Sequence, residues 1–110
     1  MLNTVLEVTV GDGVEFRLTL SNGGDTPIEL TFRDGCRVDF AAVSDGDTVW
    51  RYSDGRMFTQ AISTADLQPG ESATFTATWN DPEPGDYTAE ATLRTTADSP
   101  SATERTPFSV

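Results

Sequence analysis

A strict alternation of apolar and polar side chains is the feature that most constrains the fold of this 110-residue chain. From Val14 to Leu20 every second residue is apolar, and the residues between them are Glu, Arg and Thr. The same period of two recurs over residues 28–33, 73–79 and 87–93. Successive side chains of a β-strand point to opposite faces, so this period predicts strands with one buried and one solvated face. Such strands are typical of antiparallel sheets.

Weaker β-patterns and turn signals complete the predicted architecture. Further strands are expected at residues 6–10, 37–43, 49–52 and 103–110. Residues 63–66 are typical of a short helical turn. Pro69-Gly70 and Pro84-Gly85 each precede a strand in the order that a type II turn prefers. We predict one all-β domain, residues 1–110, folded as an antiparallel β-sandwich of about seven or eight strands.

The charge of the chain excludes several classes of function. Eighteen acidic residues stand against seven basic ones, which gives a formal net charge of −11 at pH 7. A field this negative repels phosphate backbones and anionic lipids, so neither a nucleic acid nor a membrane is an expected partner. All the basic residues are arginine, and histidine is absent. Without histidine, neither a Ser-His-Asp nor a Cys-His nucleophile can be assembled, and no imidazole metal site can form.

No other catalytic or cofactor-binding pattern is present in the sequence. The turns at residues 45–47 and 80–83 offer oxygen ligands, but neither matches a calcium-binding loop. Asp and Asn also occupy turns because they hydrogen-bond their own backbone. The acidic residues are scattered, which gives no cleft with paired carboxylates. We therefore predict that the protein is not an enzyme and binds no cofactor or metal ion.

The even spread of acidic residues along the chain bears on whether the negative charge serves a partner or the environment of the protein. A surface shaped for a cationic partner needs a local patch. An even excess instead fits a concentrated-salt cytoplasm, where a Debye length of about 3 Å at 1 M salt screens the repulsion between carboxylates. The absence of lysine agrees, because its aliphatic stem adds apolar surface. We favour a salt-adapted organism and keep the cationic partner as the alternative.

Salt adaptation predicts that the fold depends on ionic strength. Lowering KCl from multimolar to millimolar concentration removes the screening, and we expect the domain to unfold or expand. Circular dichroism across a KCl series measures this loss of β-structure. A spectrum that stays the same over the whole series would refute the account.

Cysteine usage and the N-terminal sequence favour a cytoplasmic protein. Cys36 is the only cysteine, which excludes an intramolecular disulfide and favours a reducing compartment. The first residues lack a basic start and a long apolar run, so we expect no signal peptide, and no segment is apolar enough to span a membrane. By strand alternation Cys36 shares a face with Val38 and Phe40. We therefore expect a buried structural thiol.

Residues 48–60 differ from the rest because large side chains gather around a predicted turn at Ser53-Asp54-Gly55. These large residues are Trp50, Tyr52, Met57 and Phe58. Large side chains at a loop either pack onto the sandwich or contact a partner. In the first interpretation the segment covers the core, and in the second part of it forms an outward binding surface.

The same segment resembles a known family. The run Val49-Trp50-Arg51-Tyr52-Ser53, followed by Gly55 and Met57-Phe58-Thr59-Gln60, is similar to the intracellular proteinase inhibitor family of bacteria and archaea (BsuPI). Further stretches are similar in the same order: Leu20-Ser21-Asn22, Pro27-Ile28-Glu29-Leu30, Val38-Asp39-Phe40, Leu67-Gln68-Pro69-Gly70-Glu71-Ser72, Trp79 and Pro84-Gly85-Asp86-Tyr87. The resemblance covers residues 14–94, and the block around Trp50 and Met57 is its most specific part.

The resemblance implies an immunoglobulin-like β-sandwich that inhibits an intracellular subtilisin-like serine protease. Such an inhibitor would occupy the protease cleft with a rigid, substrate-like loop, because preorganisation supplies affinity and slow release prevents turnover. The candidate protein-binding residues are Arg51, Tyr52, Ser53, Asp54, Gly55, Arg56, Met57, Phe58 and Thr59. A subtilisin-type cleft accepts a large apolar side chain, for which Met57 and Phe58 are the candidates.

Several alternatives remain open at this point. Phe58 can fill the core instead of reaching a partner, and the loops at residues 22–26, 45–47 and 80–85 are other docking edges. The chain can also be an immunoglobulin-like protein-interaction module without inhibitory activity. An open sandwich has edge strands, so we expect a monomer or an edge-paired dimer.

Overall fold

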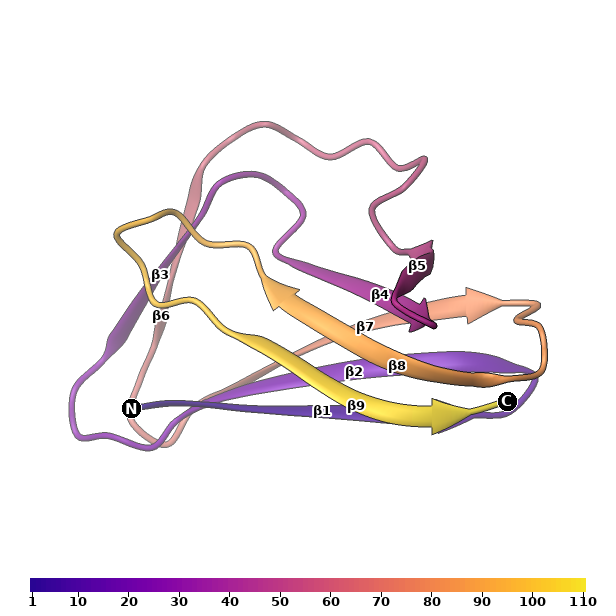
Figure 1. Ribbon diagram of the computed structural model, residues 1–110. Coiled ribbons are helices and arrows are strands. Elements are labelled where there is room, and N and C mark those ends of the chain that lie inside the picture. The colour runs from indigo at the N-terminus through magenta and orange to yellow at the C-terminus, as the bar shows by residue number, and fades with distance from the viewer.

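A computed structural model describes all residues from Met1 to Val110 and contains nine strands and no helix (Figure 1). The strands are β1 (Leu2–Val10), β2 (Gly13–Asn22), β3 (Ile28–Phe32), β4 (Val38–Ser44), β5 (Asp47–Arg51), β6 (Ser63–Leu67), β7 (Ser72–Asn80), β8 (Asp86–Leu93) and β9 (Thr103–Ser109). The predicted all-β class is confirmed. No segment of the structure is a helix of the length and apolarity needed to cross a membrane.

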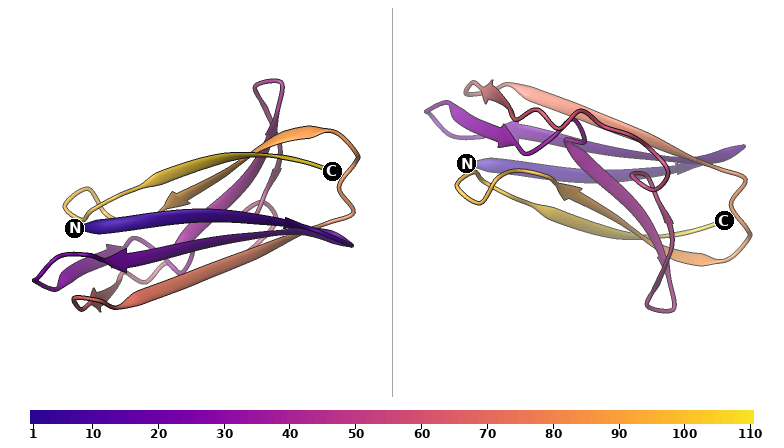
Figure 2. Two further views of the ribbon diagram at one scale, coloured as in Figure 1. Left: turned by 90° about the horizontal axis from the view of Figure 1, so that it is seen from below. Right: turned by 90° about the horizontal axis from the view of Figure 1, so that it is seen from above.

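Two larger sheets form the sandwich. One has the order β1-β2-β7 and the other β5-β4-β8-β9, and every pairing in them is antiparallel. β1 lies beside β9 on one side of the sandwich (Figures 1 and 2), where the Thr4 hydroxyl donates a hydrogen bond to the Glu104 carboxylate. The opposite side is bounded by β7 and β5, the other edge strands of the two sheets. β3 and β6 form a third, two-stranded sheet near the N-terminal end of β1 (Figure 1).

The inward side chains of the alternating strands build the core between the two larger sheets. In β2 the four apolar residues from Val14 to Leu20 are at most 1% exposed. Phe16 lies at the centre, with the ring centroids of Trp50 and Phe108 5.1 and 5.8 Å from its own. Cys36 is buried, as predicted, and its burial raises the pKa of the thiol. A thiol in this environment is structural rather than nucleophilic.

The helical turn predicted at residues 63–66 is wrong. This segment forms β6, which pairs antiparallel with β3 and sets Leu67 opposite Ile28 and Ser63 opposite Phe32. Its side chains are mostly small or polar, so they carry no clear period of two. Pairing with the neighbouring backbone decides the conformation here, because strand preference depends strongly on context. β6 also raises the strand number from the expected seven or eight to nine.

The two predicted type II turns have different outcomes. Gly70 has a φ of 80°, which agrees with the left-handed residue that a type II turn requires after proline. Gly85 does not have a positive φ, so the prediction for Pro84-Gly85 is wrong. Gly85 instead exchanges two backbone hydrogen bonds with Val110, at 3.0 and 2.9 Å. This exchange continues the antiparallel hydrogen bonding between β8 and β9 by one residue, so pairing with Val110 decides the backbone conformation of Gly85.

The β4–β5 hairpin projects from the body of the sandwich (Figure 2). Its turn places Asp45 and Gly46 at φ values of 51° and 84°, as a two-residue hairpin loop of type I′ requires. The register between the strands shifts at Ala42 and Val43, which marks a β-bulge. After β5 ends at Arg51, the chain crosses the molecule without regular structure until β6 begins at Ser63 (Figure 1).

Candidate protein-binding site

The candidate loop, Arg51–Thr59, starts with a tight turn directly after β5. The Asp54 N–H donates to the Arg51 carbonyl at 3.2 Å, and the Arg56 N–H donates to the Ser53 carbonyl at 3.3 Å. Gly55 adopts a φ of 73°, which glycine accepts without steric cost. The turn predicted at Ser53-Asp54-Gly55 is therefore present.

The Asp39 carboxylate holds the start of the candidate loop. Asp39 is 5% exposed, and it accepts hydrogen bonds from the Ser53 backbone N–H at 3.1 Å and from the Ser53 hydroxyl at 2.7 Å. The Arg51 guanidinium lies 3.5 Å from the same carboxylate. Between them, the Tyr52 N–H donates to the Phe40 carbonyl at 2.8 Å. Three consecutive residues of the loop are thus fixed against β4.

The Tyr52 ring positions both neighbours of Met57. The Arg56 guanidinium carbon lies 4.4 Å from the centroid of this ring, and the Phe58 ring centroid lies 6.1 Å from it. Tyr52 itself packs edge-on against the buried Phe40. Residues 56 and 58 both rest on Tyr52, whereas the side chain of Met57 between them is 99% exposed.

A short turn before Cys36 holds the far end of the candidate loop. The Gly35 N–H donates to the Thr59 carbonyl at 2.8 Å. The Asp34 carboxylate fixes this turn, because it accepts hydrogen bonds from the Cys36 N–H at 2.9 Å and from the Arg94 guanidinium at 3.1 Å. Burial acts to raise the pKa of the Asp34 carboxyl, but these two hydrogen bonds and the positive charges of Arg94 and Arg33 together hold the pKa below its usual range.

The contact between Gly35 and Thr59 leaves no room for a side chain. A Cβ at Gly35 would lie 2.7 Å from the Thr59 Oγ1 and 3.2 Å from the Thr59 nitrogen. We expect Gly35→Ala to displace Thr59 and to raise the hydrogen-exchange rate of the residue 35 amide, which donates to the Thr59 carbonyl, by about 5-fold, since one net hydrogen bond of about 1 kcal/mol is lost. Gly11→Ala is the matched control, because no atom lies within 4 Å of its Cβ position. Equal exchange rates in the two variants would show that this contact does not order the loop.

Residues 48–60 were expected either to cover the core or to form an outward binding surface, and each expectation describes a part of the segment. Trp50 and Tyr52 pack against the core, as the first interpretation expects. Met57 faces the solvent, as the second expects, whereas Phe58 is half-buried against Tyr52. Of the other candidate residues, Arg51 and Ser53 are half-buried, and Asp54, Gly55, Arg56 and Thr59 are exposed.

Three residues that hold the loop from elsewhere in the fold, Asp39, Asp34 and Gly35, are outside the predicted set. Asp39 carries a signal in retrospect, because it is an acidic residue inside a strand whose residues Val38–Ala42 are all buried. Asp34 and Gly35 carry no such signal in the sequence, since an Asp-Gly pair between two strands is an ordinary turn pattern. Their role depends on the approach of Thr59, which is distant in the sequence.

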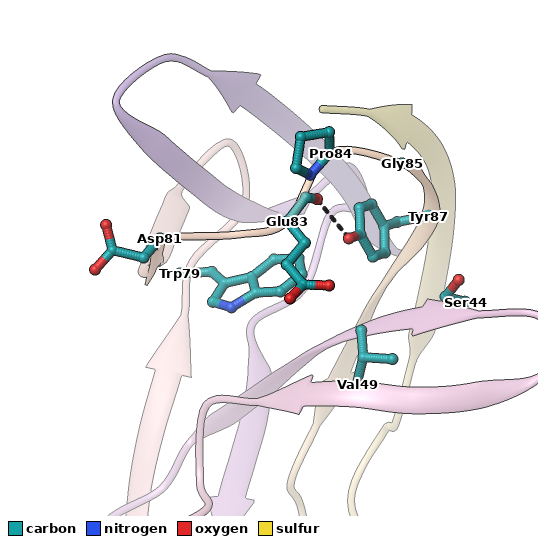
Figure 3. A pocket seen from close by; sticks show the side chains of 8 residues that line it. All are labelled: Ser44, Val49, Trp79, Asp81, Glu83, Pro84, Gly85 and Tyr87. Atoms are coloured by element: carbon teal, nitrogen blue, oxygen red, sulfur yellow. Dashed lines mark hydrogen bonds between the residues drawn. The ribbon is translucent and has the colours of Figure 1, made fainter.

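The largest hollow in the structure, about 430 Å³, lies away from the candidate loop. Figure 3 shows it between the β4–β5 hairpin and the connection from β7 to β8, where the Tyr87 hydroxyl donates to the Glu83 carbonyl at 2.6 Å. Of the alternative docking loops, residues 80–85 contribute to its lining, whereas none of residues 45–47 does. No candidate residue lines it, so the two surfaces are separate. No group of three or more Asp, Glu or Cys side chains is arranged to hold a metal ion.

The structure is a β-sandwich that holds the candidate loop against β4 and exposes the Met57 side chain on it. The family model described as "Intracellular proteinase inhibitor" (BsuPI) matches residues 3–98, and the chain belongs to this family. No curated protein matches the sequence. Among solved structures, one titled "Crystal structure of protein from Archaeoglobus fulgidus" is similar over 100% of this chain and 95% of that chain, with 11% identity and a TM-score of 0.43.

Proposed function

We propose that this protein inhibits a subtilisin-like serine protease by inserting the candidate loop into the protease cleft, with Met57 in the primary specificity pocket. Membership of a proteinase inhibitor family supports a protease as the target. The observation that carries the assignment of the loop is the 99% exposure of Met57, between two residues that rest on the Tyr52 ring. A subtilisin-type cleft binds an extended segment and takes a large apolar side chain, which this arrangement offers.

Met57 suits this role better than Phe58 because of where the two side chains lie. Phe58 is half-buried, and its ring packs against Tyr52. Moving Phe58 into a protease would give up that contact. Met57 gives up no packing on binding, and its flexible thioether adapts to the shape of a pocket.

The contacts on either side of Met57 explain how the loop could bind without being consumed. The loop is held before binding, so little conformational entropy is lost when it docks. If the protease cleaves the Met57–Phe58 bond, the new carboxyl end stays near Tyr52 through Arg56, and the new amino end stays there through Phe58. The Gly35–Thr59 hydrogen bond also holds the amino end. Both ends therefore remain in the cleft, where slow release favours resynthesis over turnover.

Titration of a purified intracellular subtilisin-like protease with this protein in molar KCl tests the proposal. We expect protease activity to fall to a small residual level as the protein approaches equimolar concentration. A protease whose primary pocket is filled by an aromatic sulfonyl fluoride should no longer capture the protein. Full activity at a large molar excess would contradict inhibition, and capture by the blocked protease would contradict occupancy of the cleft. The first result would favour an interaction module without inhibitory activity, and the second would move the contact with the protease outside its primary pocket.

A further inference from the structure

β7 forms an open edge of the sandwich. It pairs only with β2, and no backbone group from Ser72 to Asn80 makes a hydrogen bond outside that pairing. Its outward side chains, from Ser72 to Asn80, are exposed. An edge of this kind presents a row of free N–H and C=O groups to any strand that can approach it.

Two of the other edge strands of the larger sheets, β5 and β9, carry features that discourage pairing, the remaining edge strand, β1, contains the charged Glu7 and is covered by β9, and β7 carries no such feature. β5 has five residues, and its pairing with β4 contains a bulge. β9 contains Pro107 and two charged residues, and it lies beside β1. β7 has nine residues, no proline, no register shift and no charge. Natural proteins protect long edge strands with such features, so their absence from β7 indicates that this edge pairs with another strand.

The sequence of β7 is symmetric about Phe75. From Ser72 to Thr78 it reads Ser-Ala-Thr-Phe-Thr-Ala-Thr, which is nearly the same in both directions. An antiparallel partner with the same sequence, paired about a two-fold axis at Phe75, would set Thr74 opposite Thr76 and Ala73 opposite Ala77. Matched Thr–Thr pairs and an aromatic pair stabilise antiparallel strands. A two-fold interface requires a surface that complements itself, and this strand satisfies that requirement.

We propose that two copies of this chain pair through β7 and join their three-stranded sheets into one six-stranded sheet. Charge selects this partner. Each copy carries −11, so most pairs of surfaces repel, whereas β7 is uncharged throughout. Molar salt screens the repulsion that remains. This inference does not depend on inhibition of a protease.

The packing around Phe75 supports the same partner. Phe75 is half-buried and lines two hollows, of about 290 and 150 Å³. Phe75 therefore packs against the core but is not fully enclosed by the chain's own side chains. Pairing about Phe75 would bring the equivalent ring of the second copy against it, and an aromatic pair in that position adds contact area to the interface.

Sedimentation equilibrium in molar KCl tests the proposal over protein concentrations up to about 1 mM, which populate even a weak dimer. We expect a monomer–dimer equilibrium. The double variant Thr74→Glu/Thr76→Glu sets like charges opposite each other twice across the two-fold axis, and we expect it to weaken the dimer at least about 100-fold. The double variant Thr74→Lys/Thr76→Lys should also be monomeric. An equimolar mixture of the two should form a heterodimer, because each Glu then faces a Lys.

Ser101→Glu/Thr103→Glu adds the same charge at exposed positions away from β7 and should dimerise like the unmodified protein. Circular dichroism checks that each variant folds. Should the β7 variants unfold, hydrogen exchange of the unmodified protein decides the question, because β7 amides should exchange more slowly as its concentration rises. A protein that stays monomeric at all concentrations would overturn the proposal. So would a dimer that survives Thr74→Glu/Thr76→Glu, or a mixture that fails to pair.

Discussion

Replacing Met57 with alanine is expected to weaken inhibition of a subtilisin-like protease by about 30- to 1,000-fold, the effect of losing a central contact worth about 2–4 kcal/mol. The same change should leave the free energy of unfolding within about 0.5 kcal/mol, as for other surface substitutions. Both expectations follow from the position of Met57, whose side chain is 99% exposed and packs against nothing in the free protein. Inhibition constants and chemical denaturation measure the two effects.

Ile62→Ala is the matched control for this experiment. Ile62 is an exposed apolar residue in the same connection between β5 and β6, with 68% of its surface accessible, but it lies beyond the candidate loop. Its truncation should change inhibition less than about 3-fold, as most peripheral contacts do. Met57→Leu should retain inhibition, because leucine keeps a large apolar side chain of similar volume. Equal inhibition by the Met57→Ala and Ile62→Ala variants would remove Met57 from the proposed contact.

Local pattern predicts most of the strands of this fold. β2 is the clearest case, because Val14, Phe16, Leu18 and Leu20 alternate with polar residues and all four are buried. β6 was missed because Ser63–Asp66 has no bulky apolar residue, and pairing with β3 makes it a strand. Gly85 shows the same limit, since it exchanges two backbone hydrogen bonds with a distant residue, Val110, and does not adopt the positive φ that the local turn signal predicts. Predictions failed where a partner far along the chain decides the conformation.

The candidate loop shows a similar division. Its position and its turn at Gly55 follow from the sequence. The opposite orientations of Met57 and Phe58 do not, because they depend on Tyr52 lying under Arg56 and Phe58. Tyr52 is in turn fixed by β4 through the Phe40 carbonyl. Tertiary contacts, rather than residue types, determine which apolar side chain of the loop is presented.

Asp39 also anchors the start of the candidate loop, and Asp39→Ala is expected to lower the free energy of unfolding by about 2–4 kcal/mol. The carboxylate is 5% exposed and accepts two hydrogen bonds from Ser53, at 3.1 and 2.7 Å. Bonds to a charged group are the stronger kind, and their loss leaves the Ser53 donors without a protein partner. The ion pair with Arg51 adds little, because the Arg51 side chain is 39% exposed and screened by water.

Chemical denaturation of three variants separates the role of Asp39 from a general effect of removing an acid. Glu90→Ala is the matched control, since Glu90 pairs with Arg105 in the same sheet but its partner is 62% exposed, and we expect a loss below about 1 kcal/mol. Ser53→Ala removes one of the two hydrogen bonds to Asp39. The losses in Asp39→Ala and Ser53→Ala should not add in the double variant, because the two residues act through one contact.

Asp39→Ala frees residues 51–53 and should also weaken inhibition by about 10- to 100-fold. Each backbone residue that must be ordered on binding costs about 1–2 kcal/mol, and part of that order is regained in the complex. Glu90→Ala should inhibit like the unmodified protein. This readout distinguishes Asp39 from a residue that only stabilises the sandwich. If the Asp39→Ala variant is less stable but its folded form inhibits the protease with unchanged affinity, the Asp39–Ser53 contact does not order the candidate loop.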